Sequence, residues 1–430
     1  MPDSVPLHLL DHRARIDPKS HPPVRSLYIH IPFCAHKCHY CDFYSFVDTN
    51  DQQEVFLRRL IGELQALAPH AQGQPLNTIF IGGGTPSLLR ADLWEQLLAT
   101  INTHFDLSAI RAAGPPREAP WPDVEFTVEC NPESTTPALL EILRAGGVDR
   151  ISMGAQSFHR QHLLTLQRLH DPDRIGLVLE MCKAVGVPRT SIDLIYAIPG
   201  QTLEQWQEDL HQALALGTTH LSCYNLTYEP NTQMTNRLAR GEFVPLDDDL
   251  QADMFTCTGE TLKAHGLERY EVSNYSKPGH QSRHNLAYWL QEQWLAAGPS
   301  ASAHLWATHD QRAGGYRTKN IGSMGAYLSS TGPAPLADCE QPDARRALRE
   351  RIMTGVRLSV GIDFDQLLTD ADAVAPEGVA RLNRQAEEFV CDGLLTFDGP
   401  AGARRLRVTD AGWLVADFLA RKLMGAIASP

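Results

Sequence analysis

Long hydrophobic runs are missing from this 430-residue sequence. Residues 1–23 mix acidic and basic side chains and never offer the roughly 7 to 15 consecutive apolar residues of a signal peptide. No later stretch approaches the ~20 apolar residues that cross a bilayer, and the sequence has neither a lipid-anchor motif nor a basic amphipathic helix. We therefore expect a cytoplasmic protein with no direct membrane anchor.

An excess of positive charge is missing as well. The chain has 38 Lys and Arg residues against 51 Asp and Glu residues, which gives a net charge of −13. Because such a chain repels phosphate backbones, this balance argues against nucleic acid as a partner. Hydrophobic residues make up 43% of the chain, which excludes a disordered protein. At roughly 150 residues per domain, stretched to about 250 for a single barrel, the length predicts two domains.

The nine cysteines are an odd number, and their placement is uneven. Of nine cysteines, Cys34, Cys38 and Cys41 form a C-x3-C-x2-C cluster with no fourth cysteine near enough to join them. In a reducing compartment such a cluster favours metal binding over disulfides. Three thiolates on one loop can bind three irons of a [4Fe-4S] cluster and leave the fourth iron open to a ligand. A zinc site with His36 or His39 as fourth ligand is the structural alternative.

Short apolar runs alternate with amphipathic stretches in the first half of the chain. Helical periodicity is clearest over residues 54–68 and 203–216. The expected strands cover residues 26–33, 77–83, 124–130, 149–155, 190–198 and 220–228. Strands that alternate with helices predict a parallel sheet with right-handed crossovers. Polar and glycine-rich segments follow successive strands, so we favour an α/β fold with an incomplete (β/α)6 barrel over an open doubly wound sheet.

The rest of the chain predicts smaller units around this barrel. A hairpin of residues 394–397 and 404–408 between helical stretches predicts a C-terminal α+β domain that is winged-helix-like, although its balanced charge gives no support to DNA binding. A segment rich in Pro, Gly and Ala at 107–122 predicts a surface insertion. The expected order is an N-terminal extension (1–25), the barrel core (26–240), a linking region rich in aromatic residues and His (241–340) and the C-terminal domain (341–430).

A glycine run follows the second expected strand. Gly82, Gly83 and Gly84 precede Thr85 and Pro86. Without Cβ atoms, backbone amides and carbonyls can approach a ligand closely. Because this run lies one strand after the cysteine loop, it predicts a cradle for the amino group of an amino acid cofactor.

These motifs together resemble the radical S-adenosylmethionine (SAM) superfamily, and within it the group around oxygen-independent coproporphyrinogen III oxidase. The resemblance rests on YIHIPFC (28–34), GGGTP (82–86), ECNP (129–132), SMGAQSF (152–158), DLIYAIPG (193–200) and YNLTYEP (224–230), in that order along the chain. It implies that the open iron binds the amino and carboxylate groups of SAM. Reduction of the sulfonium then yields a 5′-deoxyadenosyl radical.

The resemblance also implies roles for individual residues. The cluster ligands would be Cys34, Cys38 and Cys41, and the SAM site would comprise Tyr28, Tyr40, Gly83, Gly84, Thr85, Glu129, Gln156, Arg168 and Asp193. Carboxylates suit the sulfonium, the ammonium and the ribose hydroxyls of SAM, whereas an Arg suits its carboxylate. Arg168 is expected within a helix, and Cys130 is interpreted as a small core residue.

The cysteine loop departs from the oxidase pattern, which continues C-x3-C-x2-C-x-C, because Phe43 occupies the last position. Further along, an H-N-x-x-Y-W motif is similar to the haem chaperone branch of the same group: His284, Asn285, Tyr288 and Trp289. That resemblance implies haem binding and transfer of haem to acceptor haem proteins, which include respiratory or membrane-associated ones. Decarboxylation of coproporphyrinogen III propionates is the alternative.

The residues themselves leave the haem ligand open. His284 offers an imidazole to ferric iron, and the nearby rings can cover a porphyrin. In isolation, however, the motif also fits a hydrogen-bonded structural histidine among core aromatics. His280, His304 or a cysteine thiolate are other candidates for the axial ligand. The exposed edge of an incomplete barrel must be covered by the region after Tyr228 or by a second copy in a homodimer.

Overall fold

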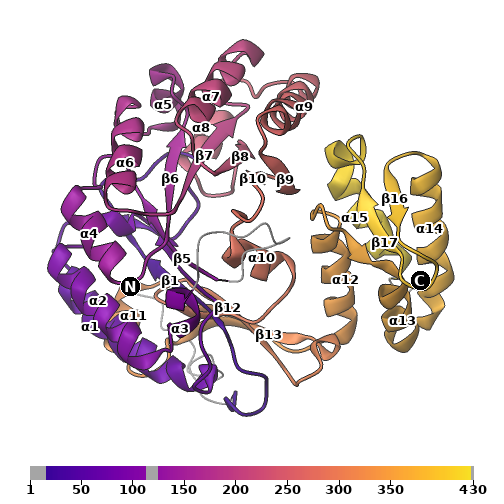
Figure 1. Ribbon diagram of the computed structural model, residues 1–430, viewed down its shortest axis with the longest axis horizontal. Coiled ribbons are helices and arrows are strands. Elements are labelled where there is room, and N and C mark those ends of the chain that lie inside the picture. The colour runs from indigo at the N-terminus through magenta and orange to yellow at the C-terminus, as the bar shows by residue number, and fades with distance from the viewer. Residues whose placement is uncertain (1–15, 113–123, 428–430) are drawn as a thin grey trace.

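The computed structural model describes residues 16–112 and 124–427. Its main feature is a nine-stranded sheet whose six central strands are parallel and follow the chain order. These are β1 (Ser26–Ile31), β4 (Thr78–Gly83), β5 (Glu125–Cys130), β6 (Arg150–Gln156), β7 (Arg189–Tyr196) and β8 (His220–Asn225). All six predicted strands are confirmed. The sheet curves into an arc with helices on its outer side, so the predicted incomplete barrel is confirmed too (Figure 1).

The crossover helices bury the outer face of the sheet. They are α1 (Gln53–Leu67), α2 (Ala91–His104), α4 (Pro137–Ala145), α5 (Arg160–Leu166), α6 (Asp173–Ala184) and α7 (Leu203–Ala215). α7 begins with a capping box between Thr202 and Gln205. Outward-facing strand residues such as Ile29, Val128 and Met153 are fully buried in one apolar core beneath these helices. The barrel is therefore stabilised mainly by apolar side chains that are buried between its outer face and the surrounding helices.

The inner face of the sheet is polar by comparison. Side chains alternate between the two faces of a strand, and in β5 the apolar Phe126 and Val128 alternate with Thr127 and Glu129. The same alternation brings Ser152 of β6 and Asp193 of β7 to the inner face, where their side chains share a hydrogen bond. The barrel lumen is thus lined with hydrogen-bonding groups.

Later segments complete the sheet and add a second one. β11 (Leu295–Ala297) pairs with β1, while β10 (Asn274–Ser276) pairs with β8 and β9 (Glu268–Glu271) pairs with β10, so the region after Tyr228 extends both edges. Helix α10 (Arg283–Trp289) lies inside the arc (Figure 1). The remaining elements of this region are α8 (Gln233–Ala239), α9 (Asp248–Ala264), α11 (Met324–Ser329) and an antiparallel sheet of β12 (Ser302–Trp306), β13 (Gly315–Asn320) and β14 (Leu336–Glu340).

The C-terminal unit has its own apolar core. It comprises α12 (Ala344–Gly355), α13 (Phe364–Val374), α14 (Val379–Cys391), α15 (Ala416–Ala426) and a small antiparallel sheet of β15 (Ile362–Asp363), β17 (Arg405–Val408) and β16 (Leu395–Asp398). The predicted hairpin is therefore confirmed, and the sequence interpretation missed α13. The predicted boundaries between the domains stay predictions.

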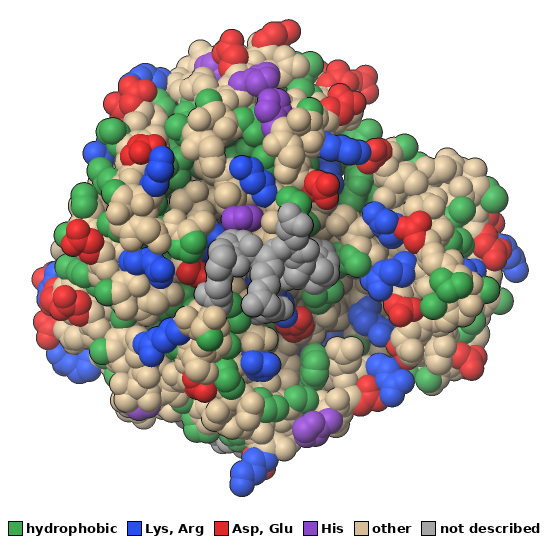
Figure 2. Space-filling view, viewed as in Figure 1, with side chains coloured by type: hydrophobic (Ala, Val, Ile, Leu, Met, Phe, Trp, Pro, Cys, Tyr) green, Lys and Arg blue, Asp and Glu red, His purple; other side chains and the backbone are tan. Residues whose placement is uncertain are grey.

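Some predicted features lie partly outside the described residues, namely the N-terminal extension at 1–15 and the insertion at 113–123. The first residues of the predicted insertion (107–122) form the short helix α3 (Ser108–Ala112). Side chains of both charge signs are interspersed over the visible face of the molecule (Figure 2). Within the described ranges, no helix is both long enough and apolar enough to cross a membrane.

Candidate cluster and cofactor site

The three clustered cysteines lie at the C-terminal end of β1. Cys34 ends the short strand β2 (Phe33–Cys34), which pairs with β3 (Phe46–Val47), and Cys38 and Cys41 lie in the loop between them. All three thiols are free and partly exposed. The loop is anchored through His39, whose N–H donates to the Leu166 carbonyl (3.2 Å) and whose carbonyl accepts from the N–H of Met234 (2.8 Å). Helices α5 and α8 therefore hold the loop in place.

Hydrogen-bond donors face two of these sulfur atoms. The Thr85 hydroxyl lies 3.6 Å from Cys34 Sγ, and Arg168 Nη1 lies 3.7 Å from Cys38 Sγ. Burial raises the pKa of the Cys41 thiol, and the positive charge of Lys37 opposes that rise. In the described part of the chain, no three His, Cys, Asp or Glu side chains gather closely enough to hold a single metal ion. Each thiolate of a [4Fe-4S] cluster binds a different iron, so a cluster does not require the thiols to converge on one point.

The glycine run packs directly on the segment that carries Cys34. A Cβ atom at Gly83, whose φ is +110°, would lie 2.5 Å from the His30 ring, and one at Gly84 would lie 2.7 Å from the Phe33 carbonyl oxygen. The N–H of Gly83 donates to Glu129 Oε2 (3.1 Å), and those of Gly84 and Thr85 donate to the carbonyls of Ile31 and Phe33. These amides are thus engaged inside the protein, so a cradle for the amino group of a ligand depends on carbonyl oxygens, which accept hydrogen bonds from an ammonium.

Two carboxyl groups face the lumen beside the glycine run. Burial, together with the negative charge of the nearby Asp193, raises the pKa of Glu129, at the end of β5, to about 7. Burial also raises the pKa of Asp193, although hydrogen bonds to Ser222 and Ser152 oppose that rise. Carboxyl groups whose negative charge is incompletely compensated form a favourable site for a cationic ligand.

Arg168 connects this region with the cysteine loop. The sequence interpretation placed it within a helix, but α5 ends at Leu166, and Gln167 turns the backbone with a φ of +54°. The Arg168 side chain consequently folds inwards, where Nη2 donates to the Gly154 carbonyl (2.8 Å). Arg168 Nε is buried without a hydrogen-bond partner among the described residues. A ligand carboxylate would satisfy this orphaned donor, so the residues present fit SAM.

Gly154 and Gln156 shape the space around Arg168. A Cβ atom at Gly154 would lie 2.6 Å from Gln156 Nε2 and 2.8 Å from Arg168 Nη2. Gln156 has a φ of +67°, an unusual value for a residue other than glycine, where β6 ends. Because Gly154 lacks a side chain, both polar groups can approach the backbone of β6.

Two tyrosines complete the predicted SAM residues. The Tyr28 hydroxyl lies 3.0 Å from His30 Nδ1, and its ring packs against Phe80 at 6.2 Å. Tyr40 lies between Cys38 and Cys41 in sequence, and burial raises its pKa. His30 escaped the sequence interpretation, although it lies two residues after Tyr28 on the same strand face. The fold thus brings the predicted SAM residues together at the C-terminal mouth of the barrel.

The haem-motif histidine is buried inside the barrel. His284 has no exposed surface, its Nδ1 lies 2.7 Å from Thr78 Oγ1, and its Nε2 lies 2.8 Å from the Tyr288 hydroxyl. Burial lowers the pKa of His284 to about 3, so the ring is neutral near pH 7. A neutral imidazole has one donor and one acceptor, and both are used here. In this conformation iron cannot bind either nitrogen unless a hydrogen bond breaks.

The other motif residues have packing contacts as well. Tyr288 meets Trp294 with 4.5 Å between ring centroids, and Trp289 packs against a cluster that contains Tyr270. The Asn285 N–H donates to the hydroxyl of Ser282, which caps α10. Of the alternative ligands, His304 Nδ1 lies 2.9 Å from the Glu292 carbonyl, and His280 Nδ1 is buried without a partner in the described part of the chain. The axial haem ligand therefore stays a prediction.

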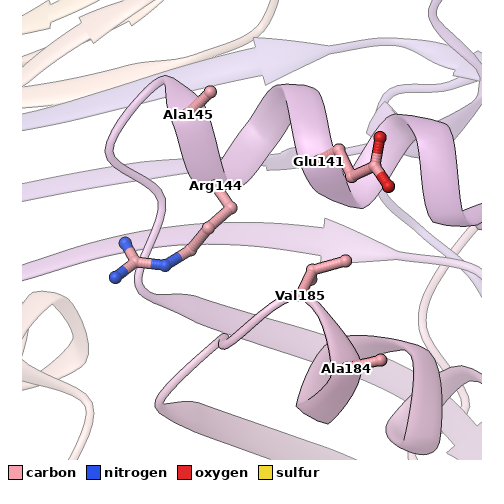
Figure 3. Close-up of a pocket in the computed structure, with 5 residues that line it drawn as sticks. All are labelled: Glu141, Arg144, Ala145, Ala184 and Val185. Atoms are coloured by element: carbon pink, nitrogen blue, oxygen red, sulfur yellow. The ribbon is translucent and has the colours of Figure 1, made fainter.

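A separate pocket lies at the end of the strands opposite to the cysteines. Figure 3 shows it between the C-terminal ends of α4 and α6, lined by Glu141, Arg144, Ala145, Ala184 and Val185. These helix ends precede β6 and β7, so the pocket lies near the N-terminal edge of the sheet. Arg144 Nε donates to the Gly186 carbonyl (3.0 Å), which ties α4 to the turn after α6. The positive charge of Arg144 therefore has a structural role at this pocket.

A three-cysteine loop at the C-terminal mouth of a partial parallel barrel is the arrangement expected of a radical SAM protein. Comparison with known proteins agrees with that class. The family model of the radical SAM superfamily matches residues 28–213. A heme chaperone HemW of Mycobacterium tuberculosis is 34% identical over 93% of this chain and 94% of its own length. One from Bacillus subtilis is 33% identical over 79% and 85%, and one from Escherichia coli is 37% identical over 65% and 70%.

Among solved structures, coproporphyrinogen III oxidase (HemN) from Escherichia coli superposes with a TM-score of 0.75 at 21% identity, over 95% of this chain and 91% of that one. This likeness concerns the fold. The chain belongs to the radical SAM superfamily and, within it, to the family whose curated members are named heme chaperone HemW. Membership of the superfamily implies a [4Fe-4S] cluster and SAM, which favours the cluster over the zinc alternative at Cys34, Cys38 and Cys41.

Proposed function

We propose that this protein is a haem chaperone, which binds haem and transfers it to acceptor haem proteins. The observation that carries the proposal is the similarity to relatives named heme chaperone, which extends over 93% of the chain for one of them. That extent includes residues beyond 213, where the radical SAM match ends, and therefore the H-N-x-x-Y-W helix.

The cluster and cofactor have defined places in this proposal. Cys34, Cys38 and Cys41 would hold the [4Fe-4S] cluster, which together with SAM supplies one-electron chemistry when both are bound. Arg168 would bind the SAM carboxylate through its orphaned Nε, since that atom is buried and unpartnered among the described residues. Glu129 and Asp193 would balance the positive charge of the sulfonium, and Tyr28, Tyr40, Thr85 and Gln156 would line the same site.

Oxygen-independent coproporphyrinogen III oxidase is the second candidate. It is supported by the shared fold, at a TM-score of 0.75. Against it stands the cysteine loop, where Phe43 is 63% exposed at the position of a further cysteine in the oxidase pattern. An exposed phenyl ring cannot ligate a metal, so we rank decarboxylation below haem transfer.

Anaerobic purification with cluster reconstitution tests both candidates. A chaperone binds haem stoichiometrically, transfers it to an apo-haem protein such as apomyoglobin, and leaves coproporphyrinogen III unchanged in the presence of SAM and a reductant. Formation of protoporphyrinogen IX would favour the oxidase, and failure to bind haem would overturn the chaperone function. A cluster-free Cys38→Ala variant separates haem binding from cluster chemistry.

The same proposal includes expectations for the location, the acceptors and the oligomeric state of the protein. We expect a cytoplasmic protein whose acceptors include respiratory or membrane-associated haem proteins, which it reaches through those partners. A homodimer is a further expectation, because β11 and β9 are the outermost strands of the nine-stranded sheet. Sedimentation analysis of the reconstituted protein tests the oligomeric state.

A further inference from the structure

Helix α10 is docked inside the barrel by its N-terminal end. The Ser282 hydroxyl donates to Glu125 Oε1 (3.2 Å), and the N–H of Arg283 donates to Glu125 Oε2 (2.9 Å). Glu125 is the first residue of β5 and is fully buried. The helix therefore starts at the N-terminal end of the strands and continues within the arc of the sheet (Figure 1).

Within the lumen, the His284 ring is fixed by two hydrogen bonds and packs against two aromatic rings. Thr78 bonds one ring nitrogen from β4, and Tyr288 bonds the other from the next turn of α10. The imidazole stacks on Phe80 with 5.3 Å between centroids and faces Tyr28 at 6.5 Å. A porphyrin cannot reach a ring that is fully buried among these residues, so ligation through His284 requires α10 to move.

The backbone on either side of α10 contains left-handed residues. Gly279 has a φ of +77° before the helix, and Gln291 has a φ of +55° after it. Gln291 is the costly one, since a residue with a Cβ atom rarely adopts this conformation. Both positions lie in the short connections from β10 and to β11, the segments whose backbone must change if α10 moves while both strands stay paired.

We propose that His284 is a gated haem ligand: Thr78 and Tyr288 hold its ring inside the barrel, and haem binds through it only after α10 leaves these two hydrogen bonds. The inference rests on the proposed function. The apparent haem affinity then equals the intrinsic affinity reduced by the fraction of open molecules. Tyr28, whose ring lies 6.5 Å from that of His284, is also one of the predicted SAM-site residues.

Thr78→Val tests the gate, because it removes one hydrogen bond without altering a residue of the H-N-x-x-Y-W motif. Ser191→Ala is the matched control, since Ser191 Oγ lies 2.7 Å from Nδ1 of another buried lumen histidine, His220. In titrations of full-length protein with hemin, followed by the Soret band, we expect Thr78→Val to lower the apparent Kd about five- to tenfold. Ser191→Ala should leave it unchanged, and adding His284→Ala to Thr78→Val should abolish the gain.

A second measurement follows the gate without haem. Diethylpyrocarbonate modifies accessible neutral imidazoles, so mass spectrometry should show His284 modified several-fold faster in Thr78→Val and in Tyr288→Phe than in the unchanged protein or Ser191→Ala. Thermal unfolding confirms that each variant is folded. If the unchanged protein binds haem while Thr78→Val keeps its affinity and both Thr78→Val and Tyr288→Phe keep its labelling rate, the gate is wrong and the chaperone function stands. If haem does not bind at all, the function fails, and the labelling rates alone decide whether α10 opens.

Discussion

The Arg168 guanidinium donates to Cys38 Sγ across 3.7 Å and to the Gly154 carbonyl across 2.8 Å, so one side chain joins the cysteine loop to β6. These contacts link residues that lie 130 and 14 positions apart in the sequence. A cation beside the thiolates stabilises their negative charge. The proposed cluster and the proposed SAM carboxylate therefore depend on the same residue.

Substitution of Arg168 should accordingly weaken SAM binding more than cluster assembly. Arg168→Ala removes a charge-assisted hydrogen bond of about 1.5–3 kcal/mol, so SAM affinity should fall roughly ten- to a hundredfold. Calorimetric titration of reconstituted protein measures this loss, while iron content reports the cluster. Arg160→Ala is the matched control, because the ion pairs of Arg160 on α5 with other described residues, Asp171 and Asp173, are exposed. Equal losses of SAM affinity in both variants would contradict a specific role of Arg168 in SAM binding.

Each of the three clustered cysteines should be required for the iron–sulfur cluster. Alanine at Cys34, Cys38 or Cys41 leaves two thiolates on the loop, and we expect bound iron and acid-labile sulfide to fall to background. Metal and sulfide analysis after anaerobic reconstitution checks this. Cys130→Ala should retain full iron, since that thiol is buried in the core outside the loop. A cluster that survives in Cys41→Ala would instead indicate another ligand.

SAM binding should depend on pH through Glu129. Its pKa is raised to about 7 by burial, so the carboxyl is mostly protonated at pH 6 and ionised at pH 8. A cationic ligand prefers the ionised form, and affinity should therefore rise up to about tenfold per pH unit below 7 and level off above it. Titrations between pH 6 and 8 measure the slope. Glu129→Gln should flatten the part of the slope that belongs to this group, and an unchanged profile would contradict the assignment.

Gly84 should not tolerate a side chain. In Gly84→Ala the new Cβ would lie 2.7 Å from the Phe33 carbonyl oxygen, a backbone atom that cannot turn away. We expect a loss of about 1–3 kcal/mol in the free energy of unfolding, together with impaired cluster assembly. Chemical denaturation of the apo-protein measures it. Gly62→Ala, in the middle of α1 with nothing within 4 Å of the new Cβ, should instead gain up to about 1 kcal/mol.

Local sequence patterns predicted the barrel well and its surroundings poorly. The strands from Ser26 to Asn225 follow from runs of buried apolar residues between amphipathic helices. Strands β9 to β14 escaped prediction because they are short, as β11 is with three residues, or mix polar with apolar residues, as β13 does, so their pairing depends on neighbours distant in sequence. Arg168 was misplaced for a related reason, since the left-handed Gln167 that ends α5 has no glycine to signal it.

The sequence by itself determined the chemistry on offer: three thiols with close spacing, a glycine run one strand later, acidic residues at strand ends and an H-N-x-x-Y-W motif. Only the tertiary structure decided how these groups are used. The curvature of the sheet turned alternate residues of its central strands towards a polar lumen, and packing around it directed Arg168 to Cys38 and enclosed His284 between Thr78 and Tyr288. The physical reason is that spacing along a strand sets which face a side chain occupies, whereas the curvature and packing of the whole sheet set what it meets there.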